Sequence, residues 1–122
     1  MPFIELTTNI ELSAEKKKQL VLDLTQAAAD ILNKPYALFN VCVRSGETFA
    51  YGGSFEPCFQ LQVTALNIFN PQDNIKFAAG FSKFLEDRLQ LSTSRGYINF
   101  YNPTDPNTGF KGTTMAEVRK MT

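Results

Sequence analysis

The sequence CFQLQVTALNIFNPQDNIKF, residues 58–77, decides the fold. Apolar and polar side chains alternate over residues 58–66, as they do in a strand with one buried face. One face carries Phe59, Leu61, Val63 and Ala65, and the other carries Gln60, Gln62 and Thr64. Asn70 can then cap a helix whose first residue is Pro71. The stretch therefore predicts a strand followed by a helix, which ends near Leu91.

The same pattern occurs earlier in the chain. Residues 3–9 form an apolar, β-branched run that predicts a strand. Ser13 is a suitable cap for a helix with apolar residues at helical spacing, and Asn33 is a suitable end for it. Further strands are expected at residues 39–44 and 97–101. Each element of the second half follows its counterpart by about 55 to 58 residues, which indicates a duplicated β-α-β unit.

The duplicated unit predicts an α+β fold, an α/β sandwich. Because β-α-β crossovers are right-handed, both helices should pack on one face of a four-stranded mixed sheet. We expect one domain over residues 1–122, with halves at about 2–50 and 57–102. In the tail, residues 103–122, we expect at most one short strand near Thr113 and weak order beyond Ala116. Apolar side chains on the uncovered sheet face predict self-association.

The composition narrows the chemistry. Twelve basic residues balance twelve acidic ones, and no apolar run is long enough to span a bilayer, so we expect neither nucleic acid nor a membrane as partner. The first residues do not resemble a signal peptide, which predicts a cytoplasmic protein. Cys42 and Cys58 are too few and too far apart to predict a metal site or a disulfide framework.

The chain contains no histidine, which excludes Ser/His and Cys/His catalysis. A base near neutral pH must then be a perturbed carboxylate, lysine or cysteine, or the α-amino group, whose reference pKa is about 7.7 to 8.0.

Short motifs along nearly the whole chain resemble the family of macrophage migration inhibitory factor and D-dopachrome tautomerase. They are MPFIEL with Thr8-Asn9, NKP at 33–35, YGGS at 51–54, EPC at 56–58, DN at 73–74, YINFY at 97–101 and GFKGTTM at 109–115. The resemblance implies a homotrimer with an active site at each subunit interface and no cofactor. It also implies keto–enol tautomerase activity toward small aromatic keto acids, such as phenylpyruvate, or dopachrome-like compounds.

The same resemblance assigns roles to individual residues. Pro2, freed by removal of Met1, would be the general base, and Lys34 would attract a substrate carboxylate. Tyr97 and Asn99 lie two apart on one strand, so their side chains share a face. The resemblance places both in the wall of a neighbouring subunit's site.

Four further residues are expected to contact the substrate: Phe3, Thr64, Leu66 and Phe110. Phe110 stands where the better-known family member has tryptophan, which affects the range of substrates. The CxxC motif of that member is absent, since Leu61 follows Cys58 by three residues, and its thiol–protein oxidoreductase activity should be absent too.

Two other interpretations stay open. In one, the protein is a secreted, cytokine-like signalling or host-modulating ligand that leaves the cell without a signal peptide and binds a cell-surface receptor, with the pocket vestigial. In the other, the same base serves decarboxylation, dehalogenation or hydration. An additional arginine near the pocket would be the usual sign of such a reaction, and Arg44 and Arg95 are the candidates.

Overall fold

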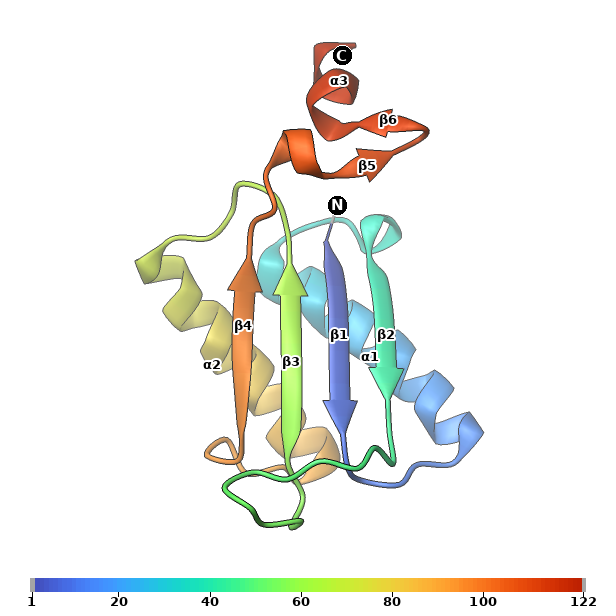
Figure 1. Ribbon diagram of the computed structural model, residues 1–122, viewed down its shortest axis with the longest axis vertical. Helices are drawn as coiled ribbons and strands as arrows, with labels where there is room; N and C mark the ends of the chain where they lie inside the picture. Colours follow the sequence, from blue (N-terminus) through green and yellow to red (C-terminus); the bar gives the residue numbers. More distant parts are fainter. Residues whose placement is uncertain (1, 122) are drawn as a thin grey trace.

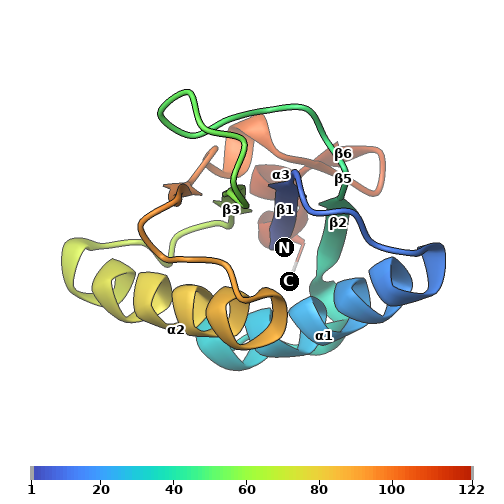
Figure 2. The same ribbon diagram turned by 90° about the horizontal axis from the view of Figure 1, so that it is seen from below.

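The computed structural model describes residues 2–121 and contains a four-stranded sheet covered by two long helices. The elements of the sandwich are β1 (Phe3–Thr8), α1 (Ala14–Leu32), β2 (Asn40–Arg44), β3 (Phe59–Thr64), α2 (Pro71–Leu89) and β4 (Gly96–Tyr101). The strand order is β2-β1-β3-β4, with parallel outer pairs and an antiparallel central pair. Both helices lie on one face (Figure 2). The predicted fold class is confirmed.

The predicted helix ends are also found. The Ser13 side chain accepts a hydrogen bond from the backbone N–H of Lys16 at 3.2 Å, and that of Asn70 accepts one from Asp73 N–H at 2.9 Å. Asn33 adopts a left-handed conformation, with φ of 54°, and ends α1. No helix within residues 2–121 is both long and apolar enough to cross a membrane.

The core fills the space between the sheet and the two helices. Its fully buried side chains include Ile4 and Leu6 of β1, Leu24 of α1 and Phe81 of α2. Gly80 lies where α2 crosses α1, and a Cβ there would come within 2.9 Å of the Ile31 side chain. The glycine therefore lets the two helices approach closely.

The helix-free face of the sheet differs from our prediction. Its side chains, identified from the strand register, are mostly polar: Glu5, Thr7, Asn40, Arg44, Gln60, Gln62, Thr64 and Asn99, with Phe3, Cys42, Tyr97 and Tyr101 among them. Most apolar side chains of the strands, such as Ile4, Leu61 and Val63, face the helices instead. This face is therefore less apolar than we predicted, although Tyr97 and Tyr101 are exposed on it.

The motifs at Thr8-Asn9 and 56–58 contact each other. The buried Thr8 hydroxyl donates a hydrogen bond to the carbonyl of Cys58 at 2.8 Å, and Asn9 accepts one from the Cys58 N–H at 3.0 Å. The Asn9 amide also donates to the carbonyls of Phe55 and Glu56. These motifs thus fasten the long loop between β2 and β3 to the end of β1.

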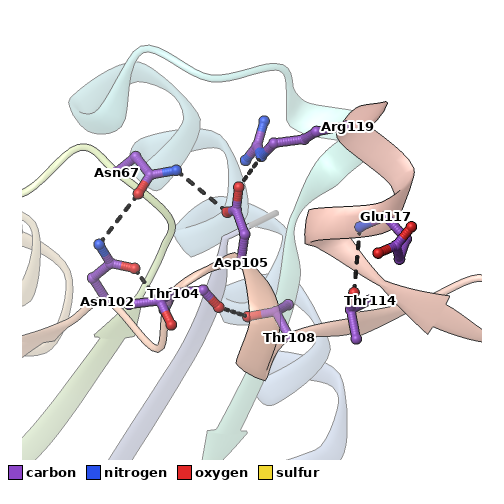
Figure 3. A network of polar contacts seen from close by, with 8 residues as sticks. All are labelled: Asn67, Asn102, Thr104, Asp105, Thr108, Thr114, Glu117 and Arg119. Atoms are coloured by element: carbon purple, nitrogen blue, oxygen red, sulfur yellow. Dashed lines mark hydrogen bonds and ion pairs between the residues drawn. The ribbon is translucent and has the colours of Figure 1, made fainter. Parts of the chain in front are cut away.

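The last part of the chain is more structured than predicted. Residues 103–121, here called the C-terminal arm, form β5 (Gly109–Phe110), β6 (Thr113–Thr114) and α3 (Met115–Lys120). Figure 1 shows the arm above the ends of the strands, over the start of β1. Where we expected weak order beyond Ala116, the chain forms α3, and Thr114 caps this helix by accepting a hydrogen bond from Glu117 N–H (Figure 3). Thr122 lies outside the described residues.

Candidate active site

A cavity of about 340 Å³ lies between the start of β1 and the C-terminal arm. Its walls come from segments far apart in the sequence: β1, the turn after α1, the chain after β3, and the arm. The lining residues are Pro2, Lys34, Ala37, Leu38, Ala65, Leu66, Phe110, Met115 and Arg119. We call it the Pro2 pocket. Four of the residues predicted from the sequence meet here, namely Pro2, Lys34, Leu66 and Phe110.

Pro2 lies in the wall of the pocket. Its side chain is fully buried, and its carbonyl accepts a hydrogen bond from the backbone N–H of Asn40 at 3.1 Å. This bond extends the pairing of β1 with β2 to the residue before the strand. Met1, whose removal our prediction requires, lies outside the described residues.

Two cationic side chains line the pocket beside apolar ones. Lys34 directly follows Asn33, and its backbone N–H donates to the carbonyl of Ala29, which fixes the chain as it leaves α1. Arg119 comes from α3, and its Nε donates to the Asp105 carboxylate at 2.5 Å. None of the described residues that line the pocket is acidic. The pocket is therefore suited to an anion with an apolar body.

Phe3 and Thr64 are not among the residues that line the Pro2 pocket. They are paired in neighbouring strands, and their side chains point to the helix-free face, because consecutive strand residues face opposite sides. Thr64 is buried there, and Phe3 is half-buried.

Tyr97 and Asn99 also lie on the helix-free face, where they line a separate cavity of about 490 Å³. Tyr97 is 69% exposed. Its hydroxyl accepts a hydrogen bond from Tyr51 at 3.3 Å, and this bond raises the pKa of Tyr51 above its ordinary value. Within one protomer the two residues do not reach Pro2.

The comparisons with known proteins agree with this architecture. The family model for macrophage migration inhibitory factor matches residues 1–116. The chain belongs to this family. D-dopachrome decarboxylase of Gallus gallus is 44% identical over 108 residues, which cover 87% of this chain and 89% of that protein. Macrophage migration inhibitory factor of Meriones unguiculatus is 29% identical over 116 residues, which cover 95% of this chain and 100% of that protein.

Solved structures of the family share the fold. Macrophage migration inhibitory factor from Oncomelania hupensis superposes with a TM-score of 0.81 at 26% identity, covering 92% of this chain and 95% of that one. Macrophage migration inhibitory factor from Trichinella spiralis superposes with a TM-score of 0.82 at 24% identity, and the match covers 92% of this chain and 98% of that one. The resemblance stated from the sequence motifs is confirmed.

In this member of the macrophage migration inhibitory factor family, the arginine at the pocket is not one that we predicted. Arg44 pairs with Glu5 on the helix-free face, and Arg95 donates to loop carbonyls, including that of Pro57. Arg119 lines the pocket instead. The sequence could have predicted α3, the helix that carries Arg119, because Thr114 followed three residues later by Glu117 is typical of a helix start.

Proposed function

We propose that the protein is a keto–enol tautomerase whose base is the Pro2 amine. The observation that carries the proposal is a fully buried Pro2 in a pocket that also contains Lys34 and Arg119 and no described acidic side chain. Removal of Met1 leaves a secondary amine at this position. Burial and neighbouring cations both disfavour its protonated form and so lower its pKa. A lower pKa leaves more of the amine as free base at neutral pH.

The reaction needs one proton transfer in each direction. The nitrogen lone pair of Pro2 takes a proton from the carbon next to the substrate's keto group, and the electrons of the broken C–H bond form a C=C bond. The carbonyl oxygen becomes an enolate, and the protonated amine returns the proton to it, which regenerates the base. Lys34 holds the substrate carboxylate, while Leu66 and Phe110 contact the apolar body.

The assembly that we propose is a homotrimer, as the family resemblance implies. Tyr97 and Asn99 are exposed on β4, an edge strand of the sheet, where a second copy can approach them. In the trimer they would complete the Pro2 pocket of a neighbouring subunit. Light scattering tests this directly, and a mass near the 13.7 kDa of one chain would refute it.

The decisive experiment measures the conversion of phenylpyruvate enol to its keto form. It compares the native protein, after mass spectrometry has verified loss of Met1, with Pro2→Gly and with a form that retains Met1. We expect both altered forms to lose about 10²- to 10⁴-fold in kcat/KM, the usual contribution of a general base. Undiminished activity in both would exclude Pro2 as the base.

Lys34 is tested with a matched control. Lys34→Gln should raise KM for phenylpyruvate about tenfold, because a charge-assisted contact to the carboxylate is lost. Lys18→Gln removes the same charge from an exposed position on α1 and should leave KM unchanged. Equal effects of the two variants would mean that Lys34 acts only through net charge.

A second candidate reaction is decarboxylation, which the names of relatives such as the Gallus gallus D-dopachrome decarboxylase favour. There, the C–C bond to the carboxylate would break, CO₂ would leave, and the electron pair would be protonated at carbon or delocalised into the ring. Mass spectrometry of the product formed from D-dopachrome separates the two reactions, because only decarboxylation makes a product lighter by one CO₂.

A further inference from the structure

Tyr51 and Tyr97 form a pair of side chains beside the helix-free face of the sheet. Their hydroxyl oxygens are 3.3 Å apart, and their ring centroids are 5.7 Å apart with the ring planes inclined at 38°. Both residues line a hollow of about 450 Å³ whose walls come from the β2–β3 loop, β3 and β4. The proposed trimer gives a place to Tyr97 but none to Tyr51.

The Tyr51 side chain is held from two sides. Its backbone N–H and carbonyl pair with those of Ser54 through two hydrogen bonds of 3.0 Å, which close the turn at Gly52-Gly53. The Arg95 guanidinium lies 5.5 Å from the centroid of the Tyr51 ring. The same guanidinium donates to the loop carbonyls of Ser54 and Pro57, so the residue before β4 fastens the loop that carries Tyr51.

The direction of the bond between the two hydroxyl groups leaves the Tyr97 hydrogen available. A phenol has a single O–H hydrogen, and Tyr51 uses its own in donating to the Tyr97 oxygen. Within residues 2–121 of one protomer, the Tyr97 hydroxyl makes no other hydrogen bond. Because Tyr97 is 69% exposed, its hydrogen can reach an approaching molecule. Accepting a bond from Tyr51 also polarises the Tyr97 O–H and makes it a stronger donor.

The acidic side chain that shares a cavity with Tyr97 is already paired. Glu5 lines the cavity of about 490 Å³ together with Tyr97, and it accepts a hydrogen bond from Arg44 at 3.3 Å. An ion-paired carboxylate competes weakly for the Tyr97 hydrogen. An enolate, which carries a negative charge on its oxygen, is a strong acceptor for a hydroxyl donor.

We propose that Tyr51 is a positioning residue, which fixes the Tyr97 hydroxyl as a hydrogen-bond donor to the enolate oxygen of the substrate. The inference rests on the proposed tautomerase function and on the trimer in which Tyr97 reaches the Pro2 pocket of a neighbouring subunit. It supplies a group for the negative charge that forms on the carbonyl oxygen, while Lys34 holds the carboxylate. A donor that is already in position stabilises this charge without rearrangement during the reaction.

The test is a double-mutant cycle on the conversion of phenylpyruvate enol to its keto form. Tyr97→Phe should lower kcat at least about tenfold, because the donor to the enolate is lost. Tyr51→Phe keeps the ring but removes the hydroxyl, and it should lower kcat about three- to tenfold with little change in KM. In the Tyr97→Phe background, Tyr51→Phe should cause no further loss. Losses that multiply in the double variant would overturn the inference, as would a Tyr51→Phe effect confined to KM.

Two controls separate positioning from a structural role. Tyr36→Phe removes a hydroxyl from another partly exposed tyrosine, which lines a separate groove beside α1, and should leave kcat unchanged. Light scattering of Tyr51→Phe should give the same mass as the native protein. A lower mass that accounts for the loss of activity would mean that Tyr51 acts through assembly, and the inference would be wrong.

A binding measurement distinguishes failure of this inference from failure of the proposed function. Benzoylformate has the keto and carboxylate groups but no hydrogen on a carbon next to the keto group, so it cannot enolise, and calorimetry can measure its dissociation constant. Absence of phenylpyruvate turnover by the native protein would refute the tautomerase proposal alone. Weaker binding of benzoylformate to Tyr51→Phe, by about threefold and only when Tyr97 is present, would still support the positioning role. Equal binding to the native protein and Tyr51→Phe would refute it.

Discussion

Thr8→Val tests whether the contact between β1 and the β2–β3 loop stabilises the protein as the structure indicates. Thr8 is completely buried, and its hydroxyl makes two hydrogen bonds, donating to Cys58 O at 2.8 Å and accepting from Ile10 N–H at 3.2 Å. Valine has the same shape but leaves both backbone groups without this partner. Each such group costs about 1 to 3 kcal/mol, and the added methyl group returns about 0.8 kcal/mol.

The expected net loss in the free energy of unfolding is about 2 kcal/mol. For a chain of this size, this lowers the Tm by about 6 to 10 °C. Thermal unfolding followed by circular dichroism measures it, with all variants at one protein concentration because oligomers unfold in a concentration-dependent way. Thr8→Ser is the control, since it keeps the hydroxyl and loses only a methyl group, worth about 1 kcal/mol. If Thr8→Val were at least as stable as the native protein, the two hydrogen bonds would not contribute as argued.

Three further predictions follow from the described contacts. Gly96→Ala should destabilise the protein by about 3 kcal/mol in urea unfolding, because its Cβ would lie 2.4 Å from the Phe59 carbonyl oxygen; no loss would contradict this close approach. Hydrogen bonds from Arg88 and Gln19 lower the pKa of Asp23 in the folded protein. The ionised Asp23 therefore stabilises the fold above the unfolded-state pKa of about 3.9, and this stabilisation is lost as the pH falls through the lower pKa of the folded state. Asp23→Asn should therefore be less stable than the native protein at neutral pH, and a difference that persisted in strong acid would contradict this cause. Tyr97→Phe should lower the pKa of Tyr51 toward its ordinary value in a phenolate absorbance titration, because the hydrogen bond to the Tyr97 hydroxyl is the main cause of the increase; an unchanged pKa would exclude that cause.

The sheet and its two long helices could be predicted from the sequence because their signals are local and repeated. Alternation over residues 58–66 and the caps at Ser13 and Asn70 define the elements without knowledge of their partners. The duplicated order then restricts the topology, since crossover handedness allows few arrangements. The polarity of the helix-free face was harder to predict, because which side chains share a face across strands depends on register.

The candidate site could be predicted only in part. Pro2, Lys34, Leu66 and Phe110 were assigned by resemblance, and the structure brings them together. Arg119 was missed because two-residue strands and a six-residue helix carry too little periodicity to be recognised in a sequence. The position of α3 depends instead on contacts between distant segments, such as those of Asp105.

The convergence of β1 and α3 on one pocket restricts where this protein can be labelled. A purification tag before Pro2 would block its amine, and a fusion after α3 would begin within a few residues of Arg119. The turn at Gly52-Gly53 is an alternative attachment point, because both glycines are exposed and a Cβ at either would meet nothing within 4 Å. Tyr51 beside it contacts Tyr97, so the label should be small. Fluorophores or affinity peptides inserted there would leave both ends of the chain native, which matters for any assay of the intact pocket.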